Sequence, residues 1–202
     1  MYSALVFLLV FTGGFSVMSI ELLAGRVLAP YFGGSVYVWG SVITIFMLAL
    51  SIGYLIGGRL SLARPSLTRL GLIFLVCAAS VVPLLLAADP FMDWVFLRID
   101  DPRYGSLLAS SVLFFVPTML MGIISPYAVR LLVEDAHSSG QVAGLLYFVS
   151  TAGSALGVLL TSFYLVLWFE VTQILIALSL ALAACGVIAL VARPALRAKA
   201  TA

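Results

Sequence analysis

Two ionisable residues, Glu21 and Arg26, stand in an otherwise apolar stretch that runs from Ser19 to Leu60. Hydrocarbon offers a lone charge neither water nor hydrogen-bond partners, so an ionisable residue at that depth marks a solute site or is held by an opposite charge. The Glu21 carboxylate could bind a cationic solute, or it could be neutralised by Arg26 or by Arg130. The five-residue spacing is imperfect for a pair on one straight helix. The sequence is compatible with either role.

Several aromatic residues could line a cavity together with Glu21. Moving a multiply charged organic cation through a helix bundle requires carboxylates or aromatic faces for cation–π contact. Tyr31 is one such aromatic residue, on the same apolar stretch as Glu21. The candidate substrate-binding residues are Glu21, Arg26, Trp39, Tyr54, Arg130 and Tyr147.

Other kinds of chemistry lack the residues that they need. The single histidine, His137, lies beside Glu134 and Asp135 in an expected loop, and Cys77 and Cys185 each lie within an apolar run. A transmembrane cytochrome needs histidines inside the bundle, and a zinc hydrolase needs several clustered ligands. We therefore expect no catalytic residue, no metal, no cofactor and no enzymatic activity in this chain.

The composition assigns the chain to the membrane proteins. Of its 202 residues, 64% are hydrophobic and 9% are charged, whereas a soluble domain has about 25% charged residues. The formal net charge of +2 is small and its carriers are scattered, which argues against a nucleic-acid partner. The expected surroundings are a lipid bilayer.

Six apolar runs approach the length of about 20 residues that a bilayer requires. Helices are expected because a lipid-exposed backbone must satisfy its own hydrogen bonds. We therefore predict an all-α, polytopic membrane bundle of six helices, with a seventh short helix as the alternative, forming one integral membrane domain over residues 1–202. The predicted helices span about residues 3–28, 36–58, 70–88, 107–125, 142–168 and 171–192.

Positive charges predict the orientation of these helices. With six spans, one side of the membrane carries Arg59, Arg64, Arg69, Arg130, Arg193, Arg197 and Lys199. The positive-inside rule then places both termini in the cytoplasm. The acidic segment 89–103 would lie outside, as a short amphipathic piece at the interface or as a patch that collects cations.

Glycines predict how the helices pack. Gly53 and Gly57 in the second run are matched by Gly153 and Gly157 in the fifth. Glycines four residues apart let two helix backbones approach closely. The match suggests two three-helix repeats, the second inverted relative to the first, as in many transporter folds.

Two blocks of residues resemble the membrane domain of bacterial spermidine synthase-like proteins. The first block consists of Glu21-Leu22, Arg26, Leu28, Pro30, Phe32-Gly33 and Ser35, followed by Trp39 and Gly57-Gly58-Arg59-Leu60. The second consists of Pro117, Met121-Gly122, Pro126, Arg130, Gly144, Tyr147, Thr151, Gly153 and Leu156-Gly157. The resemblance covers about residues 10–190.

The resemblance implies a bundle similar to half of a major-facilitator transporter. In many relatives this bundle precedes a cytosolic aminopropyltransferase-like domain, which would bind a decarboxylated S-adenosylmethionine-type donor and a polyamine. In residues 1–202 we find no strand followed by a glycine-rich turn and an acidic ribose partner, the pattern of a doubly wound nucleotide site. Aminopropyl transfer would therefore need a separate soluble partner.

The expected function is that of a non-catalytic membrane protein of the bacterial inner membrane. It would bind or transport a small cationic or amphiphilic solute, or anchor a soluble synthase-like partner. Six helices make half of a major-facilitator-like pathway, so transport would require a homodimer. The alternative is a structural or accessory subunit of a larger membrane complex, in which the faces of Gly53 and Gly157 would meet another chain.

Overall fold

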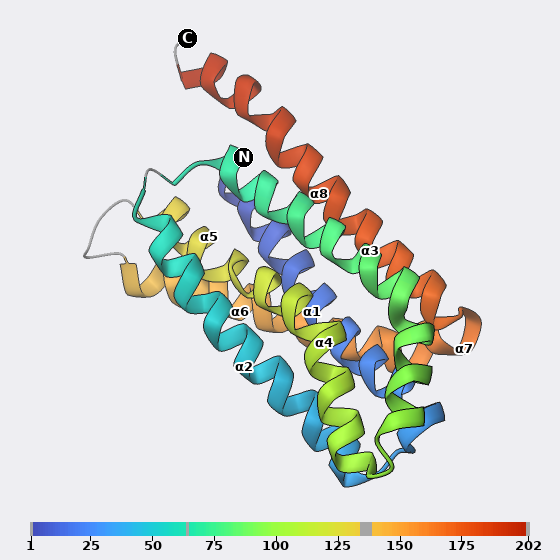
Figure 1. The fold of residues 1–202 in the computed structure, drawn as a ribbon. Coiled ribbons are helices and arrows are strands. Elements are labelled where there is room, and N and C mark those ends of the chain that lie inside the picture. The colour runs from blue at the N-terminus through green and yellow to red at the C-terminus, as the bar shows by residue number, and fades with distance from the viewer. Residues whose placement is uncertain (1, 64, 134–138, 201–202) are drawn as a thin grey trace.

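The computed structural model describes residues 2–63, 65–133 and 139–200, with side chains as far as residue 192. Within these ranges the chain is helical and contains no strand, which confirms the all-α prediction. The elements, shown in Figure 1, are α1 (Tyr2–Phe32), α2 (Val36–Ser61), α3 (Leu67–Arg98), α4 (Pro102–Gly122), α5 (Ile124–Leu132), α6 (Ser139–Leu160), the π-helix η1 (Thr161–Leu165), α7 (Val166–Trp168) and α8 (Val171–Ala200).

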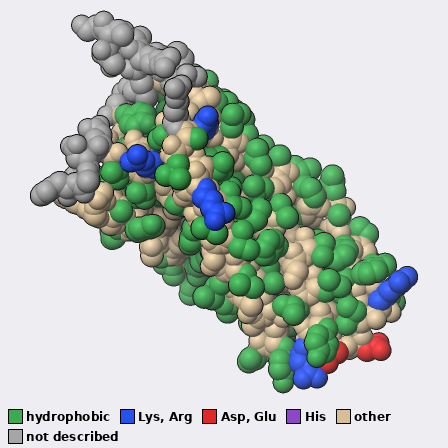
Figure 2. Space-filling model, turned by 60° about the vertical axis from the view of Figure 1, so that its left-hand side comes forward, with side chains coloured by type: hydrophobic (Ala, Val, Ile, Leu, Met, Phe, Trp, Pro, Cys, Tyr) green, Lys and Arg blue, Asp and Glu red, His purple; other side chains and the backbone are tan. Residues whose placement is uncertain are grey.

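Six helical spans are long and apolar enough to cross a membrane, as the sequence predicts. Two of them are interrupted: α4 and α5 together make one span, and α6, η1 and α7 make another. Figure 2 shows basic side chains toward both ends of the visible face, acidic side chains at one end, and mainly apolar side chains between. This distribution is that of a multi-pass membrane protein.

Helix α1 is the central element of the bundle. It contacts α2, α3, α4, α5, α6 and α8, and Figure 1 shows it passing between them. Small side chains make this possible, because Gly13, Gly14, Ser16 and Ser19 are all buried and keep α1 narrow where its neighbours approach.

Helix α2 packs through two glycines on α4 and on the junction of α4 and α5. A Cβ added at Gly57 would lie 2.6 Å from the Ile123 carbonyl oxygen, and one added at Gly53 would overlap the Met119 carbonyl oxygen. Any side chain at these positions would therefore push the two helices apart.

Helix α6 packs on α1 in the same manner. A Cβ added at Gly157 would lie 2.5 Å from the Phe15 carbonyl oxygen, and one added at Gly153 would overlap that of Phe11. The faces of Gly53 and Gly157 are thus covered by α4 and α1 of the same chain. The expectation that they meet another chain is wrong.

The outer part of α3 differs from the prediction. Residues 89–98 are not a separate interfacial piece, because α3 continues through Pro83 and Pro90 to Arg98. Met92 and Val95 are fully buried, and Phe96 lies edge-on to Tyr31 of α1 with 6.0 Å between ring centroids. Apolar packing on this face keeps the segment helical beyond the prolines.

The predicted loop over residues 126–140 is likewise helical in part. Helix α5 extends to Leu132, with Tyr127 and Ala128 fully packed on the bundle. The Tyr127 hydroxyl accepts a hydrogen bond from the Ser66 N–H at 3.1 Å, which ties α5 to the start of α3. Arg64, Glu134, Asp135 and His137, and the side chains of Arg193, Arg197 and Lys199, lie outside the described residues.

Candidate functional site

Helix α1 carries Glu21 and Arg26 on different sides. Five residues at about 100° each place them about 140° apart around the helix. The Arg26 guanidinium donates to the Val166 carbonyl oxygen of α7 at 3.2 Å. Arg26 is therefore directed toward α7, and a structural pair between Glu21 and Arg26 is not what the chain forms.

Glu21 lies well inside the membrane-spanning part of α1. It comes 11 residues before Phe32, the last residue of the helix, which is about 16 Å along the axis. Its side chain is partly buried. In the part of the chain that the structure describes, the carboxylate has no hydrogen-bond or ion-pair partner, and the salt bridge found there joins Arg103 to Asp101.

Two aromatic candidates lie on the Glu21 side of α1. Met18, about one turn before Glu21, lines a small cavity of about 50 Å³ together with Tyr54 of α2 and Ser154 of α6. One turn after Glu21, the Trp39 indole lies so close to Gly25 that a Cβ there would be 2.5 Å from the ring. Glu21 thus lies on α1 between a turn near Tyr54 and a turn that contacts Trp39.

Tyr147 and Arg130 lie away from Glu21. Helices α1 and α6 run parallel with Phe11 opposite Gly153, so Tyr147 is level with the first turns of α1, about 24 Å from the level of Glu21. Arg130 is in the last turn of α5, six residues after Ile124, whose side chain faces Gly13 of α1. Of the six candidates, the structure places Trp39 and Tyr54 on the Glu21 side of α1, and Tyr147 interacts electrostatically with Tyr54. Arg26 is directed toward α7, and Arg130 lies at the end of α5.

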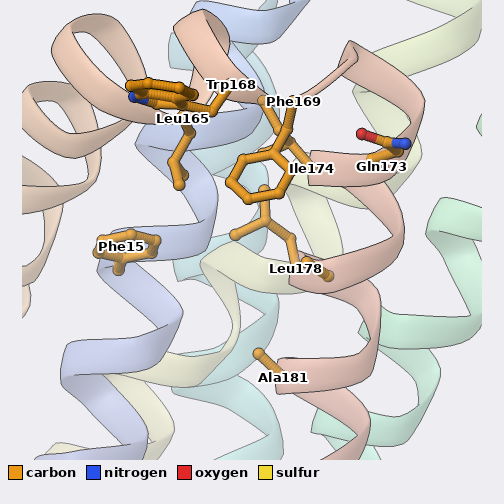
Figure 3. A pocket seen from close by; sticks show the side chains of 9 residues that line it. Phe15, Leu165, Trp168, Phe169, Gln173, Ile174, Leu178 and Ala181 are labelled. Atoms are coloured by element: carbon orange, nitrogen blue, oxygen red, sulfur yellow. The ribbon is translucent and has the colours of Figure 1, made fainter.

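A larger cavity, of about 670 Å³, lies elsewhere, between α1, the α6–α8 connection and α8. Figure 3 shows Phe15 on one side and Ile174 and Leu178 on the other, with Trp168 toward one end. Gln173 is the polar side chain of the lining, and its amide oxygen accepts from the Glu170 N–H at 3.1 Å. The other lining residues of the cavity are apolar, as in most ligand-binding pockets.

The π-helix η1 forms part of this cavity and is fixed to α1. The Thr161 hydroxyl donates to the Ser19 hydroxyl at 3.0 Å, and the Ser19 hydroxyl donates to the Gly157 carbonyl oxygen at 3.4 Å. π-Helical turns often occur at functional sites. One sequence feature marks this region, the aromatic pair Trp168 and Phe169, which also suits an interfacial anchor.

A third cavity, of about 280 Å³, lies where α1, α3 and α8 meet. Two oppositely charged side chains line it, Arg26 from α1 and Asp89 from α3, together with Tyr31 and Thr172. Sequence reasoning missed this site because its residues are far apart along the chain.

Metal-ligating side chains and thiols are few in the described part of the chain. No group of three or more His, Cys, Asp or Glu residues is found there that could hold a metal ion. Cys77 and Cys185 are buried free thiols. The exposed pair at the start of α4 is structural, because Arg103 donates through its backbone and side chain to Asp101, and these hydrogen bonds lower the pKa of Asp101.

Comparisons of the chain with protein-family models, with curated proteins and with solved structures found no match. The relation to spermidine synthase-like membrane proteins therefore stays a prediction that rests on the two blocks of residues around Glu21 and Tyr147.

Proposed function

We propose that the chain is a non-catalytic integral membrane protein of the spermidine synthase-like group that binds or transports a small cationic or amphiphilic solute. The observation that carries the proposal is the Glu21 carboxylate, which lies deep in the span without a partner among the described residues. A carboxylate at that depth is costly unless a proton or a cation neutralises it. A cationic solute would supply that charge.

Trp39 and Tyr54 complete the proposed site. On the side of α1 that carries Glu21, Tyr54 lies near the preceding turn and Trp39 near the following turn. Both side chains are partly exposed. Aromatic faces attract organic cations when these have lost part of their water. A linear amine with two or more charges would extend along α1, with one ammonium at Glu21 and its other groups toward the aromatic rings.

The inverted three-plus-three repeat is part of this proposal. In such a repeat α1 corresponds to α4, and α6 corresponds to α2. The contact of α6 with α1 should therefore correspond to the contact of α2 with α4. Gly14 of α1 lies against the Ser150 carbonyl oxygen of α6, and Gly122 of α4 lies against the Leu50 carbonyl oxygen of α2. These two glycine contacts are equivalent if the halves are inverted repeats. One six-helix unit is half of a major-facilitator-like pathway, so transport would be carried out by a homodimer.

The proposed location is the bacterial inner membrane with both termini in the cytoplasm. The basic residues Arg59, Arg69 and Arg130, which lie at or beyond the ends of spans on one side, support this orientation. The same side would anchor a soluble synthase-like partner, and that partner would bring any aminopropyl transfer.

The test is spermidine binding by purified protein in lipid nanodiscs, comparing the wild type with Glu21→Gln and Glu21→Asp. Loss of a charge-assisted contact should weaken binding about tenfold or more in Glu21→Gln, and Glu21→Asp should keep part of the affinity. Glu170→Gln is the matched control, because this carboxylate lies at the exposed start of α8. Equal affinity of the wild type and a folded Glu21→Gln variant would refute the proposal.

One observation favours an accessory subunit as the second candidate. In the span made of α6, η1 and α7 only 17% of the apolar window is buried, compared with 39% or more in each other span. A partner chain could cover this span. Purification with other membrane subunits in fixed stoichiometry would support this alternative, and a chain that purifies alone would count against it.

A further inference from the structure

The cavity between α1, α3 and α8 is lined by charges of opposite sign that do not meet. Arg26 and Asp89 both line it, yet they do not form a salt bridge with each other. The Arg26 guanidinium is held by the Val166 carbonyl oxygen. One cavity thus presents a separate cation and a separate anion, which is the complement of a zwitterion.

Most donors of Arg26 remain for a ligand. A guanidinium has five N–H donors in a planar fork, which suits the oxygens of a phosphate. One nitrogen of Arg26 is used by Val166. Asp89 is exposed and accepts only, so its complement is an ammonium group.

The place of the cavity in the bundle indicates where the ligand comes from. Arg26 lies six residues before the end of α1, which is about 9 Å along the axis and near the level at which lipid head groups begin. The remaining walls include Val27, Leu84 and Leu175, which are apolar. A ligand with a charged head and an apolar tail fits these walls better than a freely soluble one.

We propose that this cavity binds the head group of a zwitterionic phospholipid of the phosphatidylethanolamine type. The phosphate accepts hydrogen bonds from Arg26, the ammonium group lies at Asp89, and the acyl chains extend along the apolar walls. An anionic head group without an ammonium would meet Arg26 equally well but would be repelled by Asp89. The site therefore discriminates between lipids through Asp89 and holds them through Arg26.

The experiment is native mass spectrometry of the purified protein, mixed in detergent with equal amounts of phosphatidylethanolamine and phosphatidylglycerol. The wild type should retain phosphatidylethanolamine in preference. Asp89→Asn should lose or reverse this preference, and Arg26→Gln should weaken binding of both lipids about tenfold, the effect of one charge-assisted contact. Asp100→Asn and Arg98→Gln, which remove the same charges nearby, should behave as the wild type.

The outcomes separate the proposal from its competitors. Equal retention of both lipids by the wild type, or an unchanged preference in Asp89→Asn, would overturn it. Displacement of the bound lipid by free phosphoethanolamine at equal concentration would also overturn it, because the site would then prefer a soluble zwitterion. Asp89 is exposed, so Asp89→Asn tests the site even if Arg26→Gln does not fold. Glu21→Gln should leave the lipid preference unchanged, so this test is independent of solute binding.

Discussion

Gly57→Ala should push α2 away from the junction of α4 and α5 and destabilise the bundle. The new Cβ would lie 2.6 Å from the Ile123 carbonyl oxygen and 2.7 Å from the Pro126 ring. The first contact is shorter by about 0.8 Å than the 3.4 Å at which ordinary contact begins. Because one obstacle is backbone, it cannot rotate away, and overpacking of this kind costs about 1–3 kcal/mol.

The neighbouring residue supplies the control. Gly58 is also helical, and a Cβ added there would meet nothing within 4 Å. Gly58→Ala should therefore be neutral or should stabilise the helix by up to about 1 kcal/mol. The two variants differ by one position and add the same methyl group, so a difference in stability reports the helix contact alone.

The buried thiols provide the assay. Cys77 has no exposed surface and Cys185 has little, so a fluorogenic thiol-reactive dye should label them only when the bundle opens. For a chain of this size 1 kcal/mol corresponds to about 2–4 °C in the melting temperature. Gly57→Ala should therefore melt several degrees below the wild type, and Gly58→Ala should not. Equal melting temperatures of the two variants would refute the close contact of α2 with the α4–α5 junction.

Two further predictions concern hydrogen bonds. Thr161→Val removes the buried hydroxyl that donates to Ser19 and should lower the stability by about 0.6–1.7 kcal/mol, measured as a lower melting temperature in the same dye assay. The control is Ser111→Ala, which removes a hydrogen bond to the Leu107 carbonyl oxygen on an exposed face of the same helix. This variant should have the melting temperature of the wild type. The pKa of Asp101 is lowered by hydrogen bonds from Arg103, so its contribution to stability is present above the ordinary pKa of about 3.9 and is lost as the pH falls through the lowered value. Below the lowered pKa of Asp101, the wild type and Asp101→Asn should have the same melting temperature. A difference between their melting temperatures that grows as the pH falls would contradict the role given to the Asp101 carboxylate.

Local sequence sufficed for the spans and for the glycine contacts. Hydropathy is a property of each run, so the six spans were predictable with errors mainly at their ends. Gly53 and Gly157 were predictable as packing positions because a small residue at a four-residue spacing has few other uses in a membrane helix. Their partners, Met119 and Phe15, were not predictable, because they depend on which helices become neighbours.

The candidate site was predictable only in part. Glu21 stands out by its residue type and depth, whereas the direction of Arg26 depends on the rotation of α1 and on the position of the Val166 carbonyl. The continuation of α3 past Pro90 also depends on tertiary contacts, since Met92 and Val95 are buried against other helices. The cavity lined by both Arg26 and Asp89 exists only because three separate helices meet there.

The most direct measurement is a mild-detergent affinity purification from the native membrane, with mass spectrometry of the proteins and small molecules that remain bound. We predict a retained polyamine or another small organic cation in the wild type, and its loss in Glu21→Gln. A fixed set of unrelated membrane subunits, with no bound cation in either sample, would contradict the account and would leave Glu21 as a packing residue.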